Sequence, residues 1–100
     1  MGDGFSAPDL PTDVKTKLNT ATAQVFGEGV EPTYIGVGGT IPFMEIFMKE
    51  FPKANFMLTG AAFADSNIHA ANENLDLKFC ANLTSVIALV LSTLWLHSFQ

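Results

Sequence analysis

Apolar positions along the chain recur at helical spacing in two early stretches. The first begins at Thr12, a residue type that caps helices well, and continues to about Phe26, where Gly27 favours an end. The second begins near Pro42, which fits a first helical turn, and ends before Pro52. The pattern therefore predicts two helices, each with an apolar stripe that needs a surface to cover.

A third apolar stretch runs from about Leu77 to Leu96, with Asp76 in place to cap it. Its apolar residues surround most of the helix, so the helix needs burial on more than one side. Its length also suits a membrane span, because no charged residue lies between Phe79 and Gln100 when His97 is neutral. Polar side chains interrupt the stretch, and no basic residue flanks its far end. These features favour a buried core helix over a membrane span.

Two short segments between the helices are rich in strand-forming residues. They cover residues 33–35, directly after Pro32, and residues Asn55–Thr59. The resulting α-β-α-β-α order predicts an α/β fold with a parallel strand pair. Two strands make a poor sheet alone and leave their edges unpaired. We therefore expect either part of a larger domain or an obligate oligomer such as a homodimer.

Composition narrows the choice of partners and compartment. Hydrophobic residues make up 48% of the 100 residues, which is enough for a folded core. The net charge of −5 and the scattered lysines argue against nucleic acid as a partner, and the absence of arginine excludes a guanidinium clamp. Cys80 is the single cysteine, so no internal disulfide can form, which fits a cytoplasmic location.

The glycine-rich segment before the second helix is a candidate anion site. Gly38 and Gly39 allow close approach of a ligand to the backbone, and Thr40 adds a hydroxyl at the start of a helix. This arrangement suits a carboxylate or a phosphate group, although the same residues also suit an ordinary tight turn. The segment matches neither the Walker A pattern nor the GxGxxG pattern, which disfavours nucleotide binding.

The polar stretch Gly60–Leu77 is the other candidate for chemistry, with His69 at its centre. A neutral imidazole is a common zinc ligand, and Asp65 and Glu73 lie four residues to either side of it. A zinc ion needs three or four protein ligands, which one histidine cannot supply. Two interpretations stay open at this point: a metal ligand and an ordinary loop histidine.

Several linked motifs resemble one enzyme family. They are GFSAP at 4–8, GGTIPFM at 38–44, FPKA at 51–54, TG at 59–60 and SNIHAANE at 66–73. In order and spacing they resemble the C-terminal part of the catalytic domain of the aminoacylase, cytosolic dipeptidase and carboxypeptidase family of dizinc exopeptidases. The resemblance implies that residues 1–100 form part of a three-layer α/β catalytic domain, with residues 1–11 entering it and residues 12–97 forming its α/β portion.

The resemblance also implies roles for particular residues. His69 matches the family's last metal-ligating histidine, and Asn72 and Glu73 match the pair that supports it from behind. The loop Gly38–Thr40 matches the segment that contacts the carboxylate end of the substrate, a peptide or an N-acyl amino acid. The family's reaction uses a water bound by two zinc ions, with a glutamate as general base.

The family's other metal ligands have no counterpart in this sequence. They comprise an H-x-D motif, a bridging aspartate, a Glu-Glu pair and a further acidic residue. We therefore expect an incomplete site that needs the remainder of the catalytic domain, and no peptidase activity from the 100-residue chain alone. The alternatives are a non-catalytic interaction module with a peptidase-like fold and a tail-anchored membrane protein.

Overall fold

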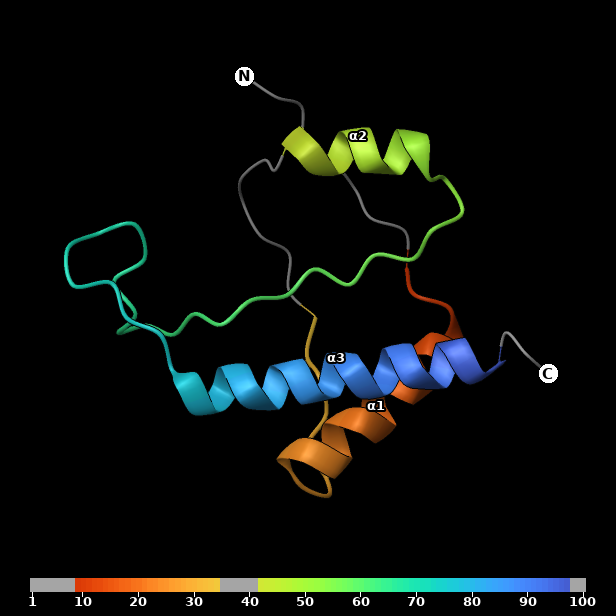
Figure 1. The fold of residues 1–100 in the computed structure, drawn as a ribbon, viewed down its shortest axis with the longest axis horizontal. Coiled ribbons are helices and arrows are strands. Elements are labelled where there is room, and N and C mark those ends of the chain that lie inside the picture. Colours follow the sequence, from red (N-terminus) through yellow and green to blue (C-terminus); the bar gives the residue numbers. More distant parts are fainter. Residues whose placement is uncertain (1–8, 35–41, 98–100) are drawn as a thin grey trace. The chain divides into compact units, whose positions relative to one another are not determined.

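The computed structural model describes residues 9–34 and 42–97. Within these residues it contains the helices α1 (Thr12–Phe26), α2 (Pro42–Glu50) and α3 (Leu77–His97), joined by loops (Figure 1). The three helices lie where the sequence pattern predicts them, with ends that differ by a residue or two. The chain divides into two compact units, one containing α1 and α3 and the other containing α2.

The predicted α/β fold is wrong for the described residues, which form helices and loops and contain no strand. Asn55–Thr59, expected as a buried strand, is irregular, and so are Thr33 and Tyr34 at the start of the other expected strand. A β-strand is held by backbone hydrogen bonds to a neighbouring strand, and the described parts of these two segments form no strand ladder. For the described residues, the parallel pair and the three-layer α/β arrangement are therefore corrected to helices and loops.

Local sequence explains the limits of α1. Asp13 places a carboxylate in the first turn, where it interacts favourably with the helix dipole. At the other end, the N–H of Gly27 donates to the carbonyl oxygen of Ala23 at 3.0 Å, and its φ of 121° is one that a glycine adopts without strain. The helix buries Val14 and Ala21, which are 4% and 3% exposed.

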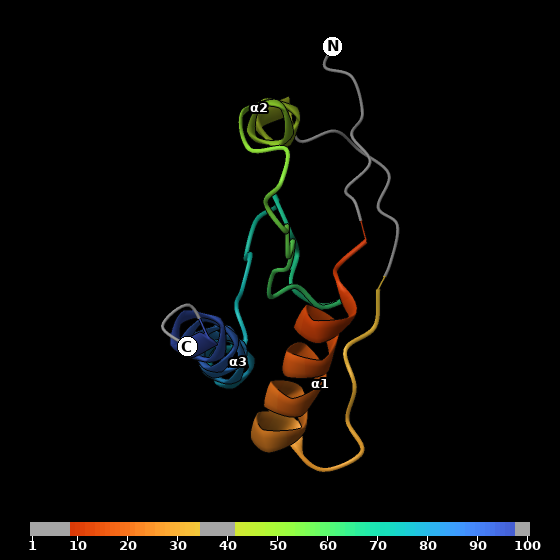
Figure 2. The same ribbon diagram turned by 90° about the vertical axis from the view of Figure 1, so that its right-hand side faces the viewer.

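The contact between α1 and α3 forms the core of their unit (Figure 2). Asp76 caps α3, since its Oδ1 accepts a hydrogen bond of 2.9 Å from the N–H of Phe79. Along α3 the buried side chains are Val86 and Val90, which are 3% and 1% exposed. They lie four residues apart and therefore on one face of the helix.

Much of α3 outside this face is open to solvent. Leu77, Leu91 and Trp95 are 74%, 58% and 63% exposed. The stretch Leu77–Trp95 has a mean hydropathy of 1.7, so its length and composition would allow it to cross a membrane, and 11% of it is buried. The sequence predicts that this helix is buried on more than one side. Among the residues that the structure describes, α3 is buried on one face only.

The unit that contains α2 is smaller. The rings of Phe43 and Phe47 meet edge to face with centroids 4.4 Å apart, and Phe51 lies 6.1 Å beyond Phe47. Glu45 and Lys49 form an ion pair of 2.9 Å along the helix. An exposed pair at this spacing adds about 0.3 to 0.5 kcal/mol.

Candidate functional site

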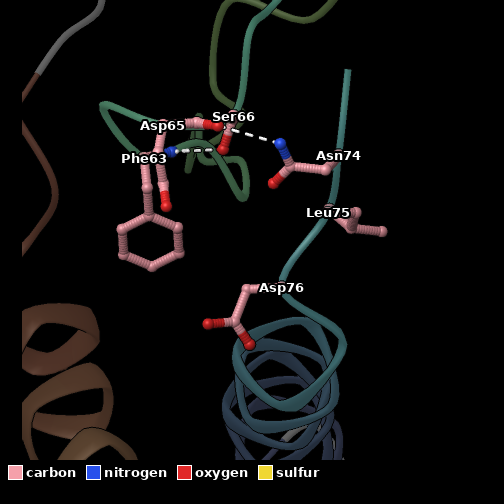
Figure 3. Close-up of a pocket in the computed structure, with 6 residues that line it drawn as sticks. All are labelled: Phe63, Asp65, Ser66, Asn74, Leu75 and Asp76. Atoms are coloured by element: carbon pink, nitrogen blue, oxygen red, sulfur yellow. Dashed lines mark hydrogen bonds between the residues drawn. The ribbon is translucent and has the colours of Figure 1, made fainter. Parts of the chain in front are cut away.

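The loop that carries His69 leads into α3 and begins with a tight turn at Ser66 (Figure 3). The N–H of Phe63 donates to the Ser66 hydroxyl at 2.8 Å, and the N–H of Ser66 donates back to the Phe63 carbonyl at 3.0 Å. Ser66 is 3% exposed, whereas its neighbours along the loop are open to solvent. This reciprocal pair satisfies the polar groups that the turn buries.

An aromatic contact attaches the turn to the helices. The Phe63 ring meets the ring of Phe79 on α3 edge to face, with centroids 5.0 Å apart and an angle of 82°. Phe79 in turn lies 5.7 Å from Phe26 at the end of α1. Each such pair contributes about 0.5 to 1.5 kcal/mol beyond its apolar area. The loop is therefore anchored to the core that α1 and α3 form.

Asn74 joins the two arms of the loop: the arm that enters it at Asp65 and Ser66, and the arm that returns from Asn72 to Asn74. Its backbone N–H donates to the carbonyl oxygen of Ser66 at 2.9 Å, and its side-chain Nδ2 donates to the carbonyl oxygen of Asp65 at 2.8 Å. Figure 3 shows the side-chain bond crossing between the arms. Nδ2 also lies 3.4 Å from the carbonyl oxygen of Asn72.

His69 lies exposed on the far part of the loop, with left-handed backbone geometry. Its φ is 60°, and Asn67 and Asn72 have φ values of 54° and 61°. Asparagine and histidine occur in this conformation more often than other non-glycine residues, although it still costs about 1 to 2 kcal/mol relative to a right-handed one. The N–H of His69 donates to Oε1 of Glu73 at 3.3 Å, which supports this conformation.

The structure thus brings three of the predicted site residues, His69, Asn72 and Glu73, into one loop. The Glu73 carboxylate supports the histidine through its backbone N–H. The exposed imidazole could serve as one ligand to a metal ion. The described residues offer no group of three or more histidine, cysteine or acidic side chains that could hold one, so they fit a zinc ion only as part of a larger ligand set.

The predicted carboxylate-binding residues Gly38, Gly39 and Thr40 lie outside the described residues.

The neck of the loop is the place where Asn74 bonds to Asp65 and Ser66. A shallow depression of about 420 Å³ lies beside this neck rather than at His69 (Figure 3). Its lining consists of Phe63, Asp65, Ser66, Asn74, Leu75 and Asp76. Sequence reasoning missed Phe63 and Asn74 as parts of the loop's support. The signal for Asn74 was its amide side chain within a loop of many polar backbone groups, where asparagine often bonds to the main chain.

Comparison with known proteins shows a partial similarity to a dipeptidase. A segment of the chain is 35% identical over 68 residues to a cysteinylglycine-S-conjugate dipeptidase from Corynebacterium striatum. The match takes in 61% of this chain and 15% of the dipeptidase, so the chain corresponds to a small part of that protein's length. No protein-family model and no solved structure matches the chain. The chain is thus similar to part of a dipeptidase, which agrees with the resemblance of its motifs to a family of peptidases.

Proposed function

We propose that this chain contributes part of the active site of a zinc-dependent hydrolase that cleaves dipeptides or N-acyl amino acids. The observation that carries the proposal is the partial similarity to a dipeptidase. The exposed His69 on an anchored loop is compatible with it, because an imidazole that is free of the core can reach a metal ion.

The proposal gives each residue a distinct task. His69 provides one ring nitrogen as a zinc ligand, and Glu73 holds the backbone at that histidine through the 3.3 Å hydrogen bond to its N–H. Gly38, Gly39 and Thr40 bind the carboxylate end of the substrate through backbone N–H groups and a hydroxyl. When bound, the zinc ions supply a water that is activated for attack on the amide carbonyl.

The remaining zinc ligands come from polypeptide outside these 100 residues. One imidazole cannot hold two zinc ions, and the described residues provide no cluster of additional ligands. We therefore expect the purified 100-residue chain to be inactive. Activity should appear only when the remainder of the catalytic domain is present.

The test captures the native protein with an antibody against the loop Gly60–Leu77. The number of zinc ions per molecule of captured protein is then measured. Hydrolysis is assayed with an S-conjugate of cysteinylglycine and with N-acetyl amino acids. We expect about two zinc ions and measurable hydrolysis. In the native gene, His69→Ala should reduce zinc-dependent hydrolysis at least about 100-fold. His97→Ala, which alters the other histidine, serves as the matched control and should leave hydrolysis unchanged.

Two results would contradict the proposal. Zinc-dependent hydrolysis by the purified 100-residue chain, abolished by His69→Ala, would show that no outside ligands are needed. A captured native protein without zinc or hydrolysis would reject the catalytic role altogether. That second result would favour a non-catalytic interaction module, for which the exposed Leu91 and Trp95 on α3 provide contact surface.

A further inference from the structure

We propose that Asn74 is a positioning residue for His69. Asn74 lies five residues from the histidine along the chain, outside the motif of residues 66–73 that contains His69. Its role follows from the way in which two donors of one residue close the neck of the loop that carries His69.

The first step concerns the arm that enters the loop. Asn74 bonds to the carbonyl oxygens of two consecutive residues of this arm, Asp65 and Ser66, at 2.8 and 2.9 Å. Ser66 is 3% exposed and tied to Phe63, whose ring packs on Phe79. The acceptors of Asn74 therefore belong to the best-anchored part of the loop.

The second step concerns the arm that returns. In the far part of the loop, the N–H of Ala70 donates to the carbonyl oxygen of Asn67 at 3.0 Å and closes a turn around His69. The other contacts there are longer: Asn67 Nδ2 lies 3.5 Å from the Asn72 carbonyl oxygen, and the His69 N–H lies 3.3 Å from Oε1 of Glu73. The Asn74 amide also reaches the Asn72 carbonyl at 3.4 Å, so it links the left-handed residue Asn72 to the fixed arm.

The third step joins these facts to His69. Its φ of 60° is unfavourable for a histidine and has to be maintained by the surrounding structure. The turn from Asn67 to Ala70 forms the local backbone around His69, and closure by Asn74 keeps the two arms at the separation that this turn requires. The consequence for a zinc site, a fixed direction for the imidazole, rests on the proposed function.

The experiment uses the 100-residue chain without metal, labelled with ¹⁵N and ¹³C for NMR. Asn74→Asp replaces the amide donor with an oxygen of the same shape, and Asn74→Ala removes the donor without adding a charge. Asn19→Asp, at an exposed position of α1, is the matched control. The readouts are the three-bond HN–Hα coupling, the Cα and Cβ shifts of His69, and the amide exchange rates.

We expect both Asn74 variants to lose the left-handed signature of His69 and to increase its amide exchange at least tenfold, with the α3 signals unchanged. Asn19→Asp should behave as wild type. Retention of the His69 signature in both Asn74 variants would overturn the inference. Loss of the α1 and α3 signals together with those of the loop would also overturn it, because Asn74 would then support the whole unit. Failure of the proposed zinc chemistry would show instead in the zinc content of the captured native protein.

Discussion

Phe79 joins three parts of its unit, and replacing it should loosen all three together. Its ring contacts Phe63 at the start of the His69 loop and Phe26 at the end of α1. Phe79→Leu keeps an apolar side chain of similar size but removes both ring pairs. Because the ring is half-buried, the substitution leaves no large cavity.

The magnitude follows from the geometry of the two pairs. The contact with Phe63, at 5.0 Å and 82°, has the favourable edge-to-face arrangement and contributes about 1 kcal/mol. The contact with Phe26, at 5.7 Å and 44°, is less favourable and contributes about 0.5 kcal/mol. Loss of part of the buried apolar area adds about 0.5 kcal/mol. We expect the free energy of unfolding of this unit to fall by about 2 kcal/mol.

Amide hydrogen exchange measures this loss within the unit itself. A change of about 2 kcal/mol corresponds to exchange of the protected α3 amides that is about 25-fold faster. The amide of Asn74, which closes the loop neck, should also exchange faster because Phe63 loses its anchor. Phe43→Leu makes the same substitution on α2 and is the control, with α3 exchange unchanged. Exchange in Phe79→Leu within twofold of wild type would refute the role assigned to the ring pairs.

Two further predictions concern the stability of α3, measured by thermal or urea unfolding. Val90→Ala should cost about 2 kcal/mol because Val90 is 1% exposed, whereas Leu91→Ala, at 58% exposure, should cost less than about 0.5 kcal/mol. Equal costs would show that the buried face of α3 has been assigned wrongly. Asp76→Ala should cost about 1 kcal/mol through loss of the cap to Phe79, and Asp76→Asn should cost a few tenths at most. If Asp76→Ala had no effect, the cap would not contribute to stability.

The helices could be predicted from the sequence because their determinants are local. Asp76 caps α3 at the position that its side chain favours, and Gly27 ends α1 with a left-handed φ. Such signals act within a few residues. They therefore do not depend on what the rest of the polypeptide provides.

The strands could not be predicted in the same way. The sequence of Asn55–Thr59 suits a strand, but the hydrogen bonds that stabilise one must come from another segment. Local composition indicates a preference and says nothing about the presence of a partner. In the described residues this segment has no strand beside it, and the preference is not realised.

In the candidate site, too, the sequence predicts the local feature but not the contacts between distant residues. The sequence predicts a polar loop around His69, and the structure shows an exposed loop there. The support by Asn74 depends on two arms of the chain that come together eight and nine residues apart, at Ser66 and Asp65. Spacing alone does not indicate such a closure, since polar residues elsewhere in the loop could equally have provided it.

The left-handed backbone at His69 also limits which residues this position can accept. Glycine adopts a φ near 60° without penalty and asparagine with little, whereas β-branched residues fit it badly. The neighbouring Asn67 and Asn72 have the same backbone conformation. A glycine at position 69 would remove the imidazole and leave the backbone without strain, so it would separate what the ring does from what the backbone conformation costs.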